Sequence, residues 1–227
     1  MPLNCQQLHE QLKKLQELKG QFDAALAATD LNLADSLQKN IQAYFEIIGD
    51  PKFQFDRWAK KHGLEGKAER IELVVGGMAK EELKAKLEEN QTLFLYNASG
   101  MIDDDGFVLS PEQTRLNLVK ISAYDMVGDT TPITTEEILE AARKIGLQFC
   151  PAEVGPRLSL QLGRQAYYTE MNIAMDPISI AEKAYIFVIL NIFEEPRIKS
   201  REFIADEKQN VGIEFVFCLP PGADWNQ

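Results

Sequence analysis

The sequence predicts an α+β fold, in which an N-terminal antiparallel helical hairpin precedes an α+β body ending in an antiparallel sheet. Residues 3–48 repeat apolar side chains at helical spacing. Residues 53–146 mix short helical and strand-like segments, and residues 166–219 hold four strand-like runs. Because the strands follow the helices instead of alternating with them, an antiparallel sheet is expected rather than βαβ winding.

Two amphipathic segments, residues 3–28 and 31–48, form the predicted hairpin. Asp30 stands between them as a candidate N-cap, and Gly49-Asp50-Pro51 is a stop signal. A short connection between two such helices implies antiparallel neighbours. The residues expected in a seam close to that of a coiled coil are Leu8, Leu12, Leu15, Phe22, Leu37, Ile41 and Phe45, with Leu33 in register. Further apolar residues flank this seam and cannot all face one helix: Leu18, Leu26, Leu31, Tyr44 and Ile47.

The second predicted domain is an α+β body over residues 52–227, after a hairpin domain over residues 1–49. Its expected helices are 53–63, 79–89 and a well-capped one that opens at Thr134 and closes at Gly146. Residues 97–113 are rich in turn formers and predict a long loop. The expected strands are 71–75, 116–121, 167–175, 184–193, 198–204 and 211–219. The alternation in the last strand predicts that one of its faces packs inward.

Composition narrows the class of protein. The 227 residues carry a formal net charge of −11, and every part of the chain is acidic, so nucleic-acid binding is not expected. Three well-separated cysteines without a CxxC pair are typical of a reducing compartment. The N-terminus does not resemble a secretory signal, and the most apolar run, 184–193, is too short to span a bilayer. We therefore expect a cytoplasmic protein that does not enter a membrane.

The acidic segment 101–112 partly resembles a calcium-binding loop. Asp103, Asp105 and Glu112 fall at the third, fifth and twelfth positions, and Gly106 at the sixth. Met101 occupies the first position, however, and cannot supply an oxygen ligand, so an acidic turn is expected instead. His9 and His62 lack partners at zinc-ligand spacing. No metal site and no cofactor are predicted.

Two further features have a functional and a structural interpretation. Gly76-Gly77 between a strand and a helix could leave backbone N–H groups for an anion, but a tight turn explains the same residues. Cys150 has Arg143 and Lys144 nearby in the sequence, which could activate a thiol, whereas Phe149 favours a buried structural cysteine.

Residues 146–165 are the strongest candidate for a binding site. Prolines and glycines interrupt an apolar stretch, and polar residues alternate with the apolar ones. Whether the segment is helical or extended, Arg157 and Gln161 share one side of it. The candidate binding residues are Glu153, Arg157, Gln161 and Arg164. The alternative is a rigid crossover into the sheet, in which Glu153 and Arg157 form a structural ion pair.

Three stretches carry a resemblance, namely TTEEILEAARKIGLQFCPAEVGPRLSLQ (134–161), MNIAMDPI (171–178) and GIEFVFCL (212–219). They resemble a recurring C-terminal module of bacterial hypothetical proteins, some of which also have an N-terminal helical hairpin. The resemblance implies a bacterial protein and a C-terminal unit, and it implies no activity.

Two classes of function remain open from the sequence. The first is a non-catalytic interaction or regulatory protein that uses the hairpin to bind a protein partner or itself, and this class is favoured by the excess of apolar residues on the hairpin. The second is an enzyme of unrecognised type with a site near residues 146–176. Ionisable groups converging on a concave pocket would favour the enzyme.

Overall fold

The structure is a computed structural model that describes residues 5–28, 30–48, 51–128, 132–163, 169–192 and 194–219. The chain divides into two compact units, residues 1–58 and residues 59–227. Within the described residues, no helix combines the length and the apolar character needed to cross a membrane.

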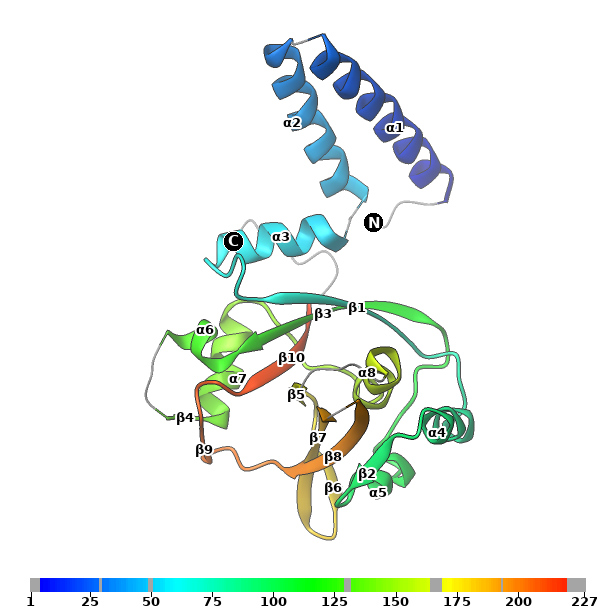
Figure 1. The fold of residues 1–227 in the computed structure, drawn as a ribbon, viewed down its shortest axis with the longest axis vertical. Coiled ribbons are helices and arrows are strands. Elements are labelled where there is room, and N and C mark those ends of the chain that lie inside the picture. Colours follow the sequence, from blue (N-terminus) through cyan, green and yellow to red (C-terminus); the bar gives the residue numbers. More distant parts are fainter. Residues whose placement is uncertain are drawn as a thin grey trace. The chain divides into compact units, whose positions relative to one another are not determined.

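The first unit contains the predicted helical hairpin. Helices α1 (Cys5–Ala27) and α2 (Leu31–Ile48) pack along each other in opposite directions (Figure 1). The Asp30 carboxylate accepts a hydrogen bond from the backbone N–H of Leu33 at 3.1 Å, so Asp30 is the N-cap of α2 as predicted. Helix α3 (Pro51–Lys61) follows, and Gly63 comes two residues after it with a φ of +67°, a backbone conformation that suits glycine.

The seam between α1 and α2 agrees in part with the predicted set. Leu15 and Leu37 are each 6% exposed, and Phe22 is half-buried against a cluster that also contains Ala25 and Ala34. Leu33 was expected in register with the seam, but 48% of its surface is exposed. Near the turn the two alanines occupy the contact, and Leu33, one residue before Ala34, therefore points to another side of α2. The side chains of Leu8, Leu12, Tyr44, Phe45 and Ile47 lie outside the described part.

The second unit is an α+β body whose elements follow most of the predicted segments. The helices of the body are α4 (Lys80–Glu89), α5 (Ala98–Asp103), α6 (Ala123–Val127), α7 (Thr135–Lys144) and α8 (Val154–Leu162). The strands are β1 (Glu69–Val75), β2 (Leu93–Leu95), β3 (Thr114–Ser122), β4 (Ile133–Thr134), β5 (Thr169–Ile173), β6 (Ile178–Ile180), β7 (Lys183–Ile192), β8 (Glu195–Glu202), β9 (Lys208–Gln209) and β10 (Glu214–Leu219).

The main sheet is mixed, so the prediction of an antiparallel sheet is correct only for part of it. Its strand order is β1-β3-β10-β5-β7-β8-β2, and β6 pairs with β7. Strand β10 runs antiparallel to β3 but parallel to β5, and the edge strand β2 runs parallel to β8. The C-terminal strand enters the centre of the sheet between two strands distant in sequence, and no local pattern encodes that pairing. A small second sheet joins β4 and β9.

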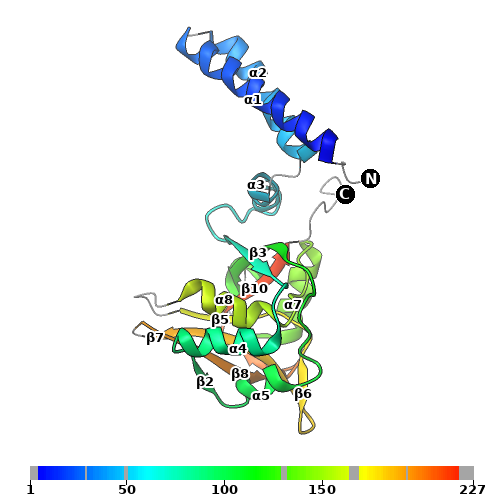
Figure 2. The same ribbon diagram turned by 90° about the vertical axis from the view of Figure 1, so that its right-hand side faces the viewer.

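Both faces of the sheet are covered. Helices α4, α5 and α8 lie on one face, whose core includes Val216 and Cys218 of β10 (Figures 1 and 2). Residues Phe215 and Phe217 point to the opposite face, where α7 packs. The face of β10 with Phe215 and Phe217 packs inward as predicted, but Val216 and Cys218 are buried as well, because the central position of β10 in the sheet buries both of its faces.

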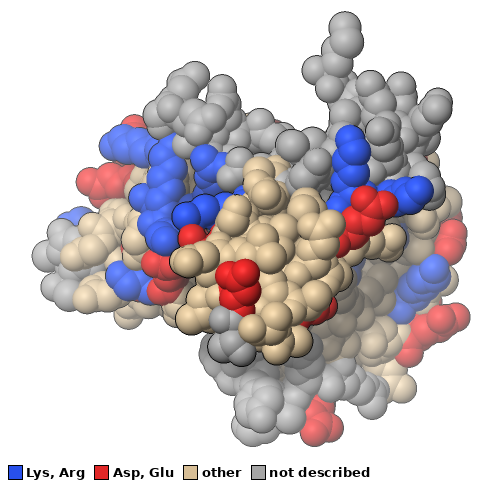
Figure 3. All heavy atoms as spheres, turned by 90° about the horizontal axis from the view of Figure 1, so that it is seen from above, with Lys and Arg blue, Asp and Glu red and all other residues tan. Residues whose placement is uncertain are grey.

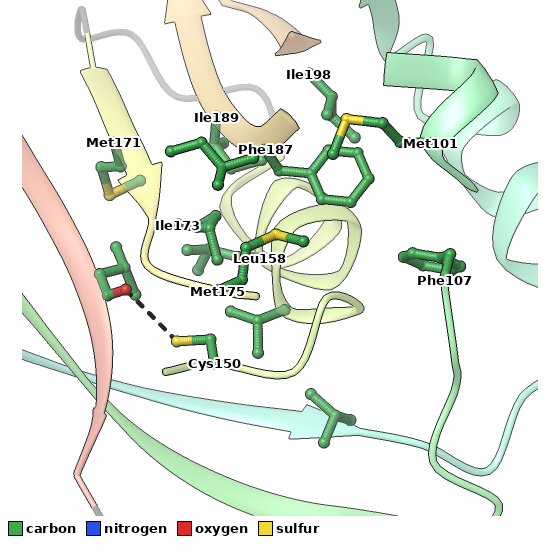
Figure 4. Packing of buried hydrophobic residues seen from close by; sticks show 14 of the residues in the cluster. Met101, Phe107, Cys150, Leu158, Met171, Ile173, Met175, Phe187, Ile189 and Ile198 are labelled. Carbon is green, nitrogen blue, oxygen red and sulfur yellow. Dashed lines mark hydrogen bonds between the residues drawn. The ribbon is translucent and has the colours of Figure 1, made fainter. Parts of the chain in front are cut away.

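The core beneath α8 is built around Phe187. Its ring meets the ring of Phe107 edge-on at 6.0 Å between centroids, and Met101, Leu158 and Met175 surround the pair (Figure 4). Met101 belongs to α5, a helix inside the segment 97–113 that was predicted to be a loop. The short helix forms because Met101 and Ile102 bury completely against the sheet, a tertiary contact that outweighs the turn-forming residues around it.

Candidate functional site

Residues 146–163 form the crossover that leads from α7 into the sheet. The crossover first runs beside the sheet, with Gln148 bridging to Cys218 and Cys150 to Met175, and it then forms helix α8. The three glycines and two prolines of this stretch allow the change of direction. Gly155 permits the close approach of α8 to the sheet, because a Cβ added there would lie 2.8 Å from the Cβ of Phe187.

Glu153 is the most buried ionisable residue of the crossover, with none of its surface exposed. One carboxylate oxygen, Oε2, accepts a hydrogen bond from the backbone N–H of Gly76 at 2.8 Å. The other, Oε1, accepts one from the backbone N–H of Ser110, also at 2.8 Å. A single side chain therefore holds two loops that are distant in the sequence, the one after β1 and the one before β3.

Arg157 lies one turn further along α8 and completes this arrangement. Its Nη2 donates a hydrogen bond to the carbonyl oxygen of Gly76 at 2.7 Å, and its Nε lies 3.7 Å from Oε2 of Glu153. The backbone of Gly76 is thus bound on both its N–H and its C=O. We call Glu153, Arg157, Gly76 and Ser110 the loop clamp. It corresponds to the structural ion pair that the sequence left as an alternative.

The loop clamp also involves Gly76-Gly77, the pair that the sequence suggested as a possible anion site. The N–H of Gly76 donates to Glu153, and the N–H of Gly77 donates to the carbonyl oxygen of Ser110 at 3.0 Å. The anion hypothesis is therefore wrong for these two groups, because the chain itself occupies both donors. A Cβ on Gly76 would lie 2.1 Å from the carbonyl oxygen of Glu112, so the close approach requires glycine.

Gln161 and Arg164 do not join the loop clamp in the described structure. The exposed Gln161 donates from Nε2 to the carbonyl oxygen of Glu72 at 2.9 Å, on the edge strand β1. It thereby occupies one polar group of an open sheet edge, a position where unpaired backbone invites other strands. Arg164 lies outside the described residues. Of the four candidate binding residues, Glu153 and Arg157 are thus brought together, and both face inward.

Cys150 is buried near Cys218, and its Sγ donates a hydrogen bond to the carbonyl oxygen of Val216 at 3.5 Å (Figure 4). Burial raises the pKa of the Cys150 thiol, and a hydrogen bond with Cys218 raises it further. A protonated, enclosed thiol suits the structural interpretation of this cysteine.

The acidic segment 101–112 does not gather into a metal site. Met101 is buried, Asp103 pairs with Lys84, and Oδ1 of Asp104 accepts a hydrogen bond from the N–H of Gly106 at 2.8 Å. Among the described residues, no three His, Cys, Asp or Glu side chains are arranged to hold a metal ion. These contacts fit the acidic turn that Met101 suggested.

The sequence did not predict a polar cavity of about 380 Å³ on the α7 side of the sheet. Glu170 and Arg201 line it, together with Gln209, Asn210, Gly212, Ile213 and Glu214. Oε1 of Glu170 accepts hydrogen bonds from Lys199 Nζ at 2.9 Å and from Arg201 Nη2 at 3.0 Å. These residues come from strands that meet only through the register of the sheet, so no local spacing could have indicated the cavity.

The hairpin presents a different surface, made of large apolar side chains near its turn. Leu26 is 48% exposed, Leu31 69% and Leu33 48%. Around them the chain is nearly neutral, since residues 5–48 contain six acidic and four basic residues. On the face drawn in Figure 3, Lys and Arg side chains lie beside Asp and Glu side chains.

Comparisons of the chain with protein-family models, with curated proteins and with solved structures find no match. The fold and the surfaces described above therefore carry the functional argument.

Proposed function

We propose that this protein is a non-catalytic interaction protein that associates through its helical hairpin. The observation that carries the proposal is the exposure of Leu26 and Leu31 on a unit that is compact by itself. Two helices bury one seam between them but leave both flanks of that seam open. Exposed leucines grouped on such a flank are typical of surfaces that bind another helix.

The low net charge of the hairpin makes it a better candidate for association than the rest of the chain. Residues 5–48 contribute a net charge of −2 to the total of −11. Electrostatic repulsion between two hairpins, or between a hairpin and another helix, is therefore weak. The rest of the chain, which is more acidic, would cause stronger repulsion.

The alternative, an enzyme with a site near residues 146–176, draws less support from the crossover. A general acid or base must reach a substrate, but both carboxylate oxygens of Glu153 are bound to backbone N–H groups inside the fold. The cavity beside Glu170 is open, yet its carboxylate already binds Lys199 and Arg201. We therefore retain the interaction protein as the proposal.

The double variant Leu26→Gln/Leu31→Gln tests this function in the full chain. Because both leucines are exposed in the isolated chain, we expect the free energy of unfolding at submicromolar concentration to change by less than about 0.5 kcal/mol. At tens of micromolar, sedimentation velocity should show that association is lost.

The matched control is Val108→Gln/Ile204→Gln, which replaces two exposed apolar residues of the other unit, 68% and 42% exposed. It should leave association intact. A fall of more than about 1 kcal/mol in the stability of the hairpin variant would mean that its leucines pack within the chain's own fold, and the proposal would then be rejected.

A further inference from the structure

A second cavity, of about 250 Å³, lies between α7, the start of the crossover and β10 (Figure 1). It shares no lining residue with the cavity beside Glu170. Its walls are apolar and come from three parts of the chain, namely Leu139, Ala142, Leu147, Phe149 and Phe217. All of these side chains are buried except Phe149, which is half-buried.

Two walls of this cavity are aromatic rings, those of Phe149 and Phe217. The ring of Phe215 supports that of Phe217 at 5.9 Å between centroids. An apolar cavity of about 150 Å³ is large enough to bind benzene. The 250 Å³ found here therefore fit one aromatic ring with a short substituent, and aromatic walls favour a planar ligand.

The cavity has one charged group, in a chain whose formal net charge is −11. Of the described residues that line it, only Arg143 is ionisable. The guanidinium carbon of Arg143 lies 5.4 Å from the centroid of the Phe149 ring, so the positive charge lies beside an aromatic wall. A ligand that fills the cavity therefore meets apolar surface and a single cation.

Arg143 keeps hydrogen-bond donors for such a ligand. Its Nη1 donates to Oε1 of Glu136 at 3.2 Å, and no other described residue accepts a hydrogen bond from its side chain. A guanidinium has five N–H donors in a planar fork, which matches the two oxygens of a carboxylate. The Arg143 and Glu136 side chains are 52% and 46% exposed, and ion pairs this exposed contribute little stability, so a ligand carboxylate can compete with Glu136.

We propose that this cavity binds a small aromatic carboxylate. The aromatic ring packs between Phe149 and Phe217, and the carboxylate accepts hydrogen bonds from Arg143. A cationic amine of the same shape is rejected, because its charge would face the guanidinium. This site goes beyond association through the hairpin, since every lining residue belongs to residues 59–227.

Two probes of matched shape test the proposal on the ¹⁵N-labelled full chain at pH 7. Phenylacetate carries a carboxylate one carbon from its ring, and benzylammonium carries an ammonium group there. We expect phenylacetate to shift the backbone amide signals of Ala142, Leu147 and Phe149 with a dissociation constant of about 1 mM, usual for a ligand of this size. Benzylammonium should leave these signals unchanged up to about 10 mM.

Three variants separate the charge from the cavity. Arg143→Gln should weaken phenylacetate binding by about fivefold, because the charged donors are lost. Glu136→Gln breaks the same ion pair but keeps the guanidinium, so it should bind phenylacetate at least as tightly as the unaltered protein. Ala142→Leu fills part of the cavity and should abolish the shifts.

Equal affinities for phenylacetate and benzylammonium would overturn the proposal, and so would an Arg143→Gln variant that binds phenylacetate with unchanged affinity. The absence of shifts at the three amides up to about 10 mM phenylacetate would overturn it as well. The Leu26→Gln/Leu31→Gln variant should bind phenylacetate as the unaltered protein does, so this test does not depend on association through the hairpin.

Discussion

Glu153 is a charged side chain placed inside the fold, and its contacts explain why the interior tolerates it. A buried carboxylate is costly unless hydrogen bonds and an opposite charge compensate it. Here two backbone N–H groups and the guanidinium of Arg157 do so. The result is a fixed distance between α8 and two loops, which gives the interrupted segment 146–163 a structural purpose.

The variant Glu153→Gln tests the loop clamp. The amide would offer one acceptor oxygen where two backbone donors need partners, and it would leave Arg157 without its counter-charge. We expect the free energy of unfolding to fall by about 3 kcal/mol, as measured by urea denaturation. Glu88→Gln on the exposed side of α4 is the control and should change stability by less than about 0.5 kcal/mol. A loss below about 1 kcal/mol for Glu153→Gln would contradict the clamp.

The glycine within the clamp gives a second prediction. Gly76 and Gly63 have similar left-handed φ angles, +76° and +67°, but only Gly76 is crowded by the carbonyl of Glu112. Gly63→Ala should therefore cost about 1 kcal/mol, from the backbone conformation alone. Gly76→Ala should cost at least about 2 kcal/mol more, because the loop must also move. Equal losses in thermal denaturation would show that the contact with Glu112 is not restrictive.

At the scale of single helices and strands, sequence patterns predicted the features that depend on neighbouring residues. The hairpin, the N-cap at Asp30 and the capping box at Thr134 follow from spacing and capping chemistry, and the structure contains all three. Helix α5 and the parallel pairing of β10 with β5 depend on contacts between distant segments, and the sequence did not predict them. The candidate site shows the same division. The Glu153–Arg157 pair is one helical turn apart and could be foreseen, but its loop partners could not.

The α1–α2 seam predicts a contrast between two leucines of α2. Leu37 is 6% exposed and packs with Ala25 and Ala34, whereas Leu33 is 48% exposed. Leu37→Ala should lower the stability of the hairpin by about 2–4 kcal/mol, because it opens a cavity in the seam. Leu33→Ala should cost less than about 0.5 kcal/mol. Native-state hydrogen exchange of the α1 and α2 amides measures both, and a larger loss for Leu33 would place the seam on the wrong side of α2.

The capping box of α7 predicts a dependence on pH. The backbone and side chain of Thr134 donate hydrogen bonds to the Glu137 carboxylate, both at 2.8 Å, and lower its pKa below the ordinary value of 4.5. A lowered folded-state pKa stabilises the protein above the unfolded-state pKa, and this stability is lost as the pH falls through the folded-state value.

Thr134→Ala should therefore lower the free energy of unfolding at pH 7, and the difference from the unaltered protein should shrink as the pH falls below 4.5. Urea denaturation at pH 7 and at pH 3.5 measures the two differences. A difference that stays constant between these pH values would show that the Glu137 carboxylate takes no part in the cap.

At the scale of the whole molecule, the chain combines a mixed sheet covered on both faces with a hairpin that leaves leucines exposed. In residues 59–227, the loop clamp holds the buried charges of the crossover. The described residues there line a polar cavity and contain no group of side chains arranged to hold a metal ion. The hairpin exposes two leucines, Leu26 at 48% and Leu31 at 69%. We therefore propose that the chain associates through the hairpin.

Sedimentation equilibrium of the full chain between about 1 and 200 μM tests that claim most directly, over concentrations that cover the affinities of weak and moderate protein complexes. The unaltered protein should change reversibly from the mass of one chain to the mass of two as its concentration rises. The Leu26→Gln/Leu31→Gln variant should keep the mass of one chain over the whole range. A single-chain mass for the unaltered protein at every concentration, or a dimer unaffected by the two substitutions, would contradict it.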